Sequence, residues 1–131
     1  MSDIEKVNGG SLIDILHKSK GIDIYKPFNR EILLFETHIA GTRHIGNMDQ
    51  LINKINIGDK VSFFREADNE YDPNAIRVEI ESKEKIGYIP MADNPVFARL
   101  MDAGKLLYGK IKSYENRGSW KYISLEIYLS E

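Results

Sequence analysis

The sequence predicts a mainly β protein with short helices (α+β), built as a small antiparallel barrel of six strands. Two observations predict this fold. Short stretches in which apolar and polar residues alternate, as in half-buried strands, recur along most of the chain. The helical stretches between them are short, and none is placed as a regular crossover between parallel strands. This order favours antiparallel pairing in a closed or nearly closed sheet.

The composition limits the classes of protein to consider. The chain has 131 residues, the size of one ordinary domain, and its 42% hydrophobic and 29% charged residues suit a folded, soluble protein. It lacks cysteine, which excludes disulfides and thiolate metal sites and fits a cytoplasmic location. No apolar run approaches the roughly 20 residues of a membrane span, and we expect no signal peptide, because charged residues come first. The formal net charge of −2 counts against a nucleic-acid binder, which is usually basic.

Residues 1–30 are expected to form a leader, a short amphipathic helix and an extended connector. Ser11 is a suitable N-cap, apolar side chains follow at helical spacing over residues 12–20, and Gly21 can end the helix. A helix this short is not stable alone. Its apolar side must therefore pack on the domain or on a partner.

Residues 31–131 are expected to form the barrel domain. Alternation predicts strands at residues 31–40, 60–65, 75–81, 86–89, 106–114 and 121–129. A short helix is predicted over residues 48–55, and a second one begins with Asn94 as N-cap and Pro95 as first helical residue. Turns rich in Gly, Asn, Asp and Pro join the strands, and the longest spans residues 68–74.

The last two predicted strands carry basic residues interleaved with aromatic ones. From Lys105 to Tyr122 there are five basic residues and one acidic residue. Alternation would place four side chains on one face: Tyr108, Lys110, Lys112 and Tyr114. Such a face suits single-stranded nucleic acid, because cations neutralise phosphates and rings stack on bases. The structural alternative is that lysines and aromatic residues are simply common in exposed and edge strands.

The turns between residues 36 and 90 carry the other candidate binding side chains: Arg43, His44, Asn69, Tyr71, Asp72 and Tyr88. An arginine can contact a phosphate through two hydrogen bonds. The rings of Tyr71 and His44 could stack on a base. The carboxylate of Asp72 would repel a phosphate but could accept a hydrogen bond from a free sugar hydroxyl, or it could merely organise the turn at Pro73.

No motif of a known catalytic class is present in the sequence. It lacks a nucleophile elbow, a Walker loop and a dinucleotide fingerprint. His38 and His44 lack the spacing of a standard metal site, and Asp68 and Asp72 lack the glycine and distal glutamate of a calcium loop. We therefore expect no enzyme, no cofactor and no metal. An unrecognised metal-dependent hydrolase that uses His38, His44 and Asp72 is the alternative.

Three stretches of the central region resemble the HIRAN domain. They are residues 39–44 (IAGTRH), residues 65–76 (READNEYDPNAI) and residues 86–90 (IGYIP). The resemblance covers roughly residues 32–128 and implies an OB-like barrel that binds single-stranded DNA. In the best-known eukaryotic members, the domain has a pocket for a free 3′ end and is attached to a fork-remodelling DNA translocase. The ATPase modules of those large relatives have no counterpart in this sequence.

The resemblance also implies roles for matching residues. Arg43 would hold the DNA backbone, Tyr71 would stack on the terminal base and Asp72 would accept a hydrogen bond from the 3′-hydroxyl. Four positions depart from the family pattern: His44 replaces a tyrosine, Asp68 an asparagine, Tyr88 a histidine and Pro90 a lysine. These departures bear on end specificity rather than on the fold.

The sequence thus predicts a non-enzymatic module that binds single-stranded DNA or DNA 3′ ends, active in DNA repair beside a helicase or nuclease. Its expected binding residues are Arg43, His44, Asn69, Tyr71, Asp72 and Tyr88, with Lys110 and Lys112 extending the groove. The alternative is a protein-interaction module that docks through the helix at residues 12–20, which the pI near 5.9 favours. DNA versus RNA and the oligomeric state stay open.

Overall fold

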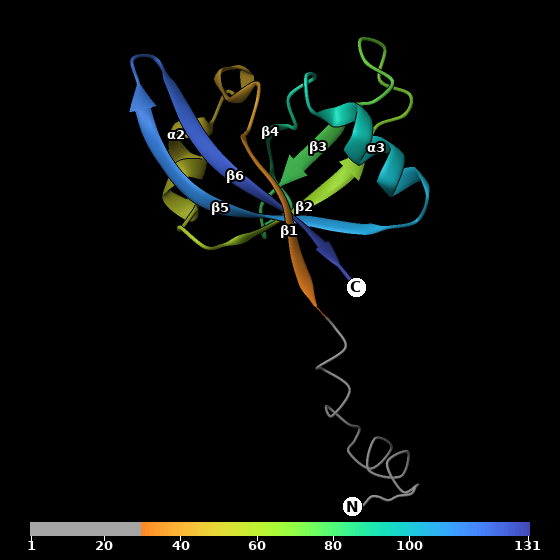
Figure 1. Ribbon diagram of the computed structural model, residues 1–131. Coiled ribbons are helices and arrows are strands. Elements are labelled where there is room, and N and C mark those ends of the chain that lie inside the picture. The colour runs from red at the N-terminus through yellow and green to blue at the C-terminus, as the bar shows by residue number, and fades with distance from the viewer. Residues whose placement is uncertain (1–29) are drawn as a thin grey trace, which may run out of the picture. The chain divides into compact units, whose positions relative to one another are not determined.

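The computed structural model describes residues 30–131, so the helix expected at residues 12–20 lies outside the described residues. Within the described part, six strands form one curled sheet in the spatial order β1-β6-β5-β2-β3-β4 (Figure 1). The strands are β1 (Glu31–His38), β2 (Lys60–Arg65), β3 (Ile76–Glu79), β4 (Lys85–Tyr88), β5 (Leu106–Arg117) and β6 (Trp120–Ser130). The predicted mainly β, OB-like antiparallel fold is confirmed.

Short helices connect the strands, as the sequence indicated. They are the 3₁₀ turn η2 (Thr42–His44), the helix α2 (Met48–Leu51), the 3₁₀ turn η3 (Ile52–Lys54) and the helix α3 (Asn94–Asp102). The single helix predicted over residues 48–55 is therefore α2 followed by η3. No helix among the described residues has the length and apolar character needed to cross a membrane.

The core lies on the concave side of the sheet. In β2, β3, β5 and β6, alternate residues point inward and are buried, among them Val61, Val78, Ile123, Leu125 and Ile127, whereas no residue of β1 is fully buried. The longest strand pair, β5 with β6, runs from Leu106 opposite Ser130 to Arg117 opposite Trp120. Burial of this apolar set is the main force that holds the sheet in its curled form.

The two ends of the sheet meet between Ala40 and Tyr88. The Ala40 N–H donates to the Tyr88 carbonyl at 2.7 Å, and the Tyr88 N–H donates to the Ala40 carbonyl at 2.9 Å. Gly87 allows this approach, because a Cβ there would overlap the carbonyl oxygen of Ala40 and the side chain of Ile39. The glycine of the IGY stretch therefore serves to close the barrel.

The prediction that alternating residues 108–114 of β5 share one face is wrong. The register of β5 against β6 shifts between Ile111 and Ser113, so that Lys112 lies in a bulge. Beyond the bulge, Tyr114 stands opposite the buried Ile123, on the inner side. Before it, Lys110 stands opposite Glu126 on the outer side. The four side chains Tyr108, Lys110, Lys112 and Tyr114 do not share one face, because the extra residue breaks the two-residue period.

The start of α3 also differs from the prediction. The N-cap is Asp93, and Asn94 and Pro95 lie in the first turn. The Thr37 hydroxyl donates to Asp93 Oδ2 at 2.8 Å, which links β1 to the start of this helix. Asn94 is only 2% exposed, so its side chain is available to contacts inside the fold rather than to solvent.

Candidate nucleic-acid interface

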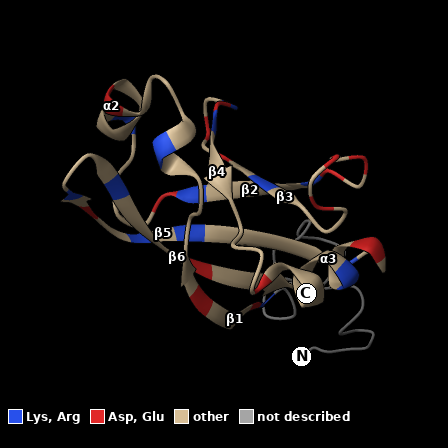
Figure 2. Cartoon of the chain, turned by 90° about the horizontal axis from the view of Figure 1, so that it is seen from above, with Lys and Arg blue, Asp and Glu red and all other residues tan. Residues whose placement is uncertain are grey.

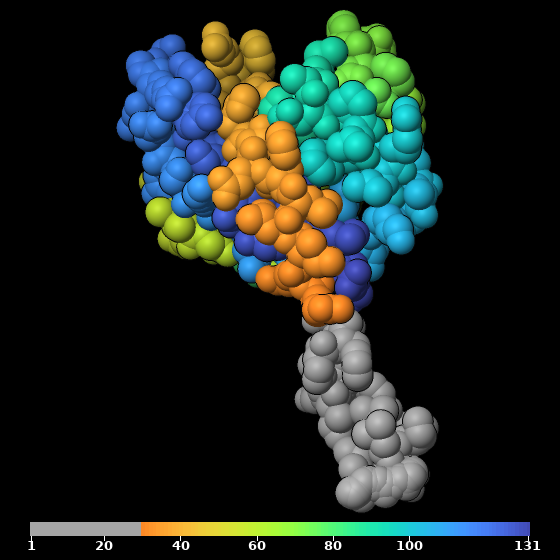
Figure 3. All heavy atoms as spheres, viewed as in Figure 1, coloured from red at the N-terminus to blue at the C-terminus, as the bar shows by residue number. Residues whose placement is uncertain are grey.

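Several connections gather at one end of the barrel, the upper rim in Figure 1: η2, the β2–β3 loop, the β4–α3 connection and the β5–β6 hairpin. A pocket of about 500 Å³ opens there. In the space-filling view, the η2 segment and the segment after β4 are separated by a notch at this end (Figure 3). Five of the eight predicted binding residues line the pocket: His44, Asn69, Tyr71, Asp72 and Tyr88.

Tyr71 presents an aromatic ring to solvent from a fixed backbone. The residue is 85% exposed. Asn69 Oδ1 accepts the backbone N–H groups of Tyr71 at 2.8 Å and of Asp72 at 3.0 Å. This side-chain-to-backbone bonding is typical of asparagine in turns. Asn69 therefore shapes the loop, and the exposed ring of Tyr71 is placed where a planar ligand group can stack.

The carboxylate of Asp72 is held from two elements. Its Oδ1 accepts the backbone N–H of Asn74 at 2.9 Å, which is the turn-organising contact considered from the sequence. Its Oδ2 accepts the side-chain amide of Asn94, from α3, at 2.8 Å. A carboxylate has about four acceptor positions, so these two bonds orient Asp72 without saturating it.

Glu66 joins the β2–β3 loop to β4. Its Oε1 accepts from the Asn69 amide at 3.0 Å and from the Tyr88 hydroxyl at 2.9 Å, and its Oε2 accepts from Arg77 at 2.8 Å. Burial raises the pKa of Glu66, but the hydrogen bonds from Asn69, Tyr88 and Arg77 outweigh it and lower that pKa below its ordinary value. Burial, followed by the bond to Glu66, raises the pKa of Tyr88.

Sequence reasoning missed Glu66 and Asn94 as parts of this site. The only sequence feature that pointed to Glu66 was its place in the READNEYDPNAI stretch, which resembles the family. The sequence around Asn94 predicted a helix cap and gave no indication of a role in the pocket. Each of the two bonds, Tyr88 to Glu66 and Asn94 to Asp72, joins residues 22 positions apart, beyond the range of any turn or helix pattern.

Arg43 borders a second, smaller pocket of about 110 Å³, between η2 and the β5–β6 hairpin. Its guanidinium carbon lies 5.5 Å from the centre of the Trp120 ring, within the range of a cation–π contact. The buried Thr42 hydroxyl donates to the Lys121 carbonyl at 2.7 Å and fixes η2 against β6. Arg43 therefore supplies positive charge beside the main pocket, whereas the Lys121 ammonium is paired with Asp49 Oδ1 at 3.2 Å.

Charge is divided between the two sides of this end. Figure 2 shows acidic residues gathered on the loop between β2 and β3, and basic residues on η2 and along the β5–β6 hairpin. An anionic strand that enters the pocket would meet less repulsion from the η2 and hairpin side.

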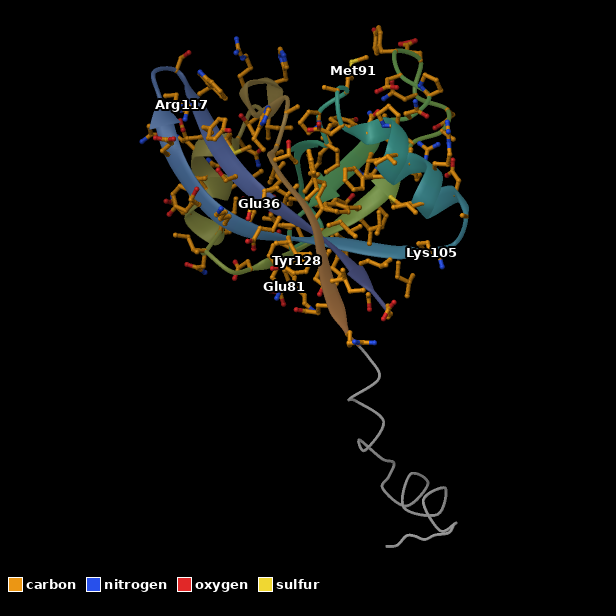
Figure 4. The ribbon with its side chains drawn as sticks, viewed as in Figure 1. Glu36, Glu81, Met91, Lys105, Arg117 and Tyr128 are labelled. Atoms are coloured by element: carbon orange, nitrogen blue, oxygen red, sulfur yellow. The ribbon has the colours of Figure 1, made fainter. Side chains whose placement is uncertain are left out.

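Lys110 and Lys112 line neither of these two pockets. The Lys112 ammonium lies 2.8 Å from Glu36 Oε1, and this hydrogen bond raises the pKa of Lys112. The Lys110 ammonium lies 4.8 Å from the centre of the Tyr128 ring. Figure 4 labels Glu36 and Tyr128 on the barrel wall, away from Met91 at the pocket end. The two lysines thus belong to the outer wall.

The residues of the alternative hydrolase are not brought together. His38 packs its ring against Tyr122, with 5.3 Å between ring centres, and does not line the pocket that contains His44 and Asp72. Over residues 30–131, no group of three or more His, Cys, Asp or Glu side chains is arranged to hold a metal ion.

Comparison with known proteins identifies relatives of this fold. The model of the HIRAN domain family matches residues 32–131. A protein from Lactobacillus plantarum is similar, with 28% identity, a TM-score of 0.73, and coverage of 79% of this chain and 98% of that one. No curated protein matches.

Two structures of the human HLTF HIRAN domain share the fold, and each comparison covers 76% of this chain and 78% of the other. The crystal structure gives 20% identity and a TM-score of 0.58. The NMR structure of its DNA-bound conformation gives 18% identity and a TM-score of 0.55.

Proposed function

Since this chain belongs to the HIRAN domain family, we propose that it is a non-enzymatic module that binds single-stranded DNA at its free 3′ end. The human HLTF domain, which has the same fold, has a DNA-bound conformation. In this proposal the module acts in the cytoplasm, in DNA repair, and presents strand ends to a helicase or nuclease.

The juxtaposition of Tyr71 and Asp72 carries the proposal. An exposed ring and an oriented carboxylate stand side by side in one pocket. A ring of this kind stacks on any base, a contact worth about 1–3 kcal/mol. The carboxylate favours a hydroxyl donor and disfavours a phosphate, so the pair suits a terminal nucleotide with a free 3′-hydroxyl rather than the interior of a strand.

The remaining candidate residues have different roles in this proposal. His44 adds a second ring at the pocket, whereas Asn69 and Tyr88 hold the loop in place. Arg43 and the neighbouring pocket take the phosphate before the terminal nucleotide. Lys110 and Lys112 lie on the outer wall, so they contact the DNA only when the bound strand is long enough to extend beyond the pocket.

Fluorescence anisotropy with two oligonucleotides of one sequence, ending in a 3′-hydroxyl or a 3′-phosphate, tests the proposal. The 3′-hydroxyl form should bind more tightly, because Asp72 repels the added charge, and both affinities should fall as salt increases. Equal affinity for the two oligonucleotides would exclude end recognition. Absence of binding at low salt would exclude the DNA-binding function itself.

A further inference from the structure

Asp72 offers acceptors on both of its carboxylate oxygens, whereas a 3′-terminal deoxyribose has one hydroxyl to donate. Oδ1 accepts one bond, from the Asn74 backbone at 2.9 Å, and Oδ2 accepts one bond, from the Asn94 amide at 2.8 Å. Each oxygen of a carboxylate can accept about two hydrogen bonds, so each has capacity for one more. A single hydroxyl would use only one of these.

Asn94 fixes the second oxygen. It is 2% exposed, belongs to α3 rather than to the loop that carries Asp72, and lines the same pocket. Leaving its buried amide or the facing carboxylate oxygen without a partner would cost about 1–3 kcal/mol. The contact is therefore expected to persist when the pocket is empty, and it keeps the plane of the carboxylate in one orientation before any ligand arrives.

Two adjacent acceptors on one carboxylate match two adjacent hydroxyl donors. Acidic side chains accept a hydrogen bond from the ribose 2′-hydroxyl in dinucleotide-binding sites, and the 2′-hydroxyl is the group by which proteins distinguish RNA from DNA. The pocket of about 500 Å³ is large enough for a nucleotide.

We propose that this pocket holds a 3′-terminal ribonucleotide through both its 2′- and 3′-hydroxyls on Asp72, more tightly than a 3′-terminal deoxyribonucleotide. Asn94 acts as the positioning residue for this carboxylate. The inference rests on the proposed end-binding function and names the terminal sugar that the site prefers.

The test uses the full chain and three labelled DNA oligonucleotides that differ only in the last sugar: deoxyribose, ribose or 2′-O-methylribose, each with a 3′-hydroxyl. Anisotropy should show the ribose end binding about three- to tenfold more tightly than the deoxyribose end. The 2′-O-methyl end should lose this gain, because its 2′ oxygen cannot donate a hydrogen bond.

Equal or weaker binding of the ribose end would overturn the inference. The proposed function would still stand in that case, provided that the deoxyribose end binds better than its 3′-phosphate form. Failure of all three oligonucleotides to bind at low salt would overturn both. These comparisons use the unaltered chain, so they do not depend on the folding of a variant.

A substitution then tests the role of Asn94. Asn94→Ala should reduce the preference for the ribose end, because Asp72 loses one of its two orienting bonds. Asn53→Ala is the matched control, since Asn53 is exposed and contacts the Asp49 carbonyl away from the pocket. A ribose preference that survives unchanged in a folded Asn94→Ala variant would exclude the positioning role.

Discussion

The hydroxyl of Tyr88 donates a 2.9 Å hydrogen bond to Glu66, and this contact ties the strand that closes the barrel to the loop that carries the candidate binding residues Tyr71 and Asp72. Tyr88 is bonded through its backbone to Ala40 on one side, and its hydroxyl donates to Glu66 of the loop on the other. Closure of the sheet and the shape of the pocket are therefore linked through one residue. The family pattern described from the sequence has a histidine at this position. The tyrosine of this chain provides an uncharged hydrogen-bond donor there.

Removing only the hydroxyl of Tyr88 should loosen the loop. Tyr88→Phe leaves the ring and breaks a hydrogen bond to a charged group, worth about 1.5–3 kcal/mol of unfolding free energy. Chemical denaturation should show this loss, and the preference for a 3′-hydroxyl over a 3′-phosphate should fall. Tyr114→Phe is a suitable control, because Tyr114 lies outside the pocket. Unchanged stability and unchanged end preference in Tyr88→Phe would contradict the linkage.

Glu66 should make the stability of the domain sensitive to acid. Its pKa is lowered in the folded state, so its contribution is present at neutral pH and is lost as pH falls through that lowered value. The melting temperature should decline below about pH 4.3, the value of an unperturbed glutamate. Glu66→Gln should be less stable at pH 7 and should lose part of this decline. A variant with the same acid profile as the parent would exclude Glu66 as a contributor.

The alternation of apolar residues predicted much of the sheet. The second strand was expected at residues 60–65, and β2 has those bounds because Val61 and Phe63 point inward between polar neighbours. The bulge at Lys112 was missed for a physical reason. One inserted residue leaves the sequence on either side looking regular, and only the partner strand reveals the change of face.

The site was less accessible from the sequence than the sheet. Tyr71 and Asp72 stand in a turn, and only the family resemblance distinguished them from ordinary turn residues. Glu66 and Asn94 act through partners 22 positions away. Local patterns carry no information about such contacts, because they depend on how the sheet curls and where α3 packs.

Gly87→Ala should destabilise the barrel strongly. A Cβ at this position would overlap the Ala40 carbonyl oxygen, so the two backbone bonds that close the sheet would have to shift or break. We expect a loss of about 2–4 kcal/mol, in the upper range for single substitutions. Gly46→Ala is the matched control, because nothing lies within 4 Å of a Cβ at Gly46. Equal melting temperatures for the two variants would contradict the closure argument.

Arg43 should contribute more to DNA binding than Lys112 does, although both are basic. Arg43 borders the pocket next to the main one, whereas Lys112 is paired with Glu36 at 2.8 Å on the outer wall. Arg43→Ala should weaken binding of a short oligonucleotide about tenfold, the effect of losing about 1.4 kcal/mol. It should also reduce the slope of log affinity against log salt by about 0.7, the value for one phosphate contact on a single strand.

Lys112→Ala should leave both quantities nearly unchanged with the same short oligonucleotide, because its charge is already neutralised by a neighbouring carboxylate. Titrations at several salt concentrations measure affinity and slope together. If Lys112→Ala lowered the slope as much as Arg43→Ala, the strand would have to run along the β5 wall rather than over η2. A longer oligonucleotide separates these paths, since a strand that leaves the pocket over η2 reaches the β5 wall only when it is extended.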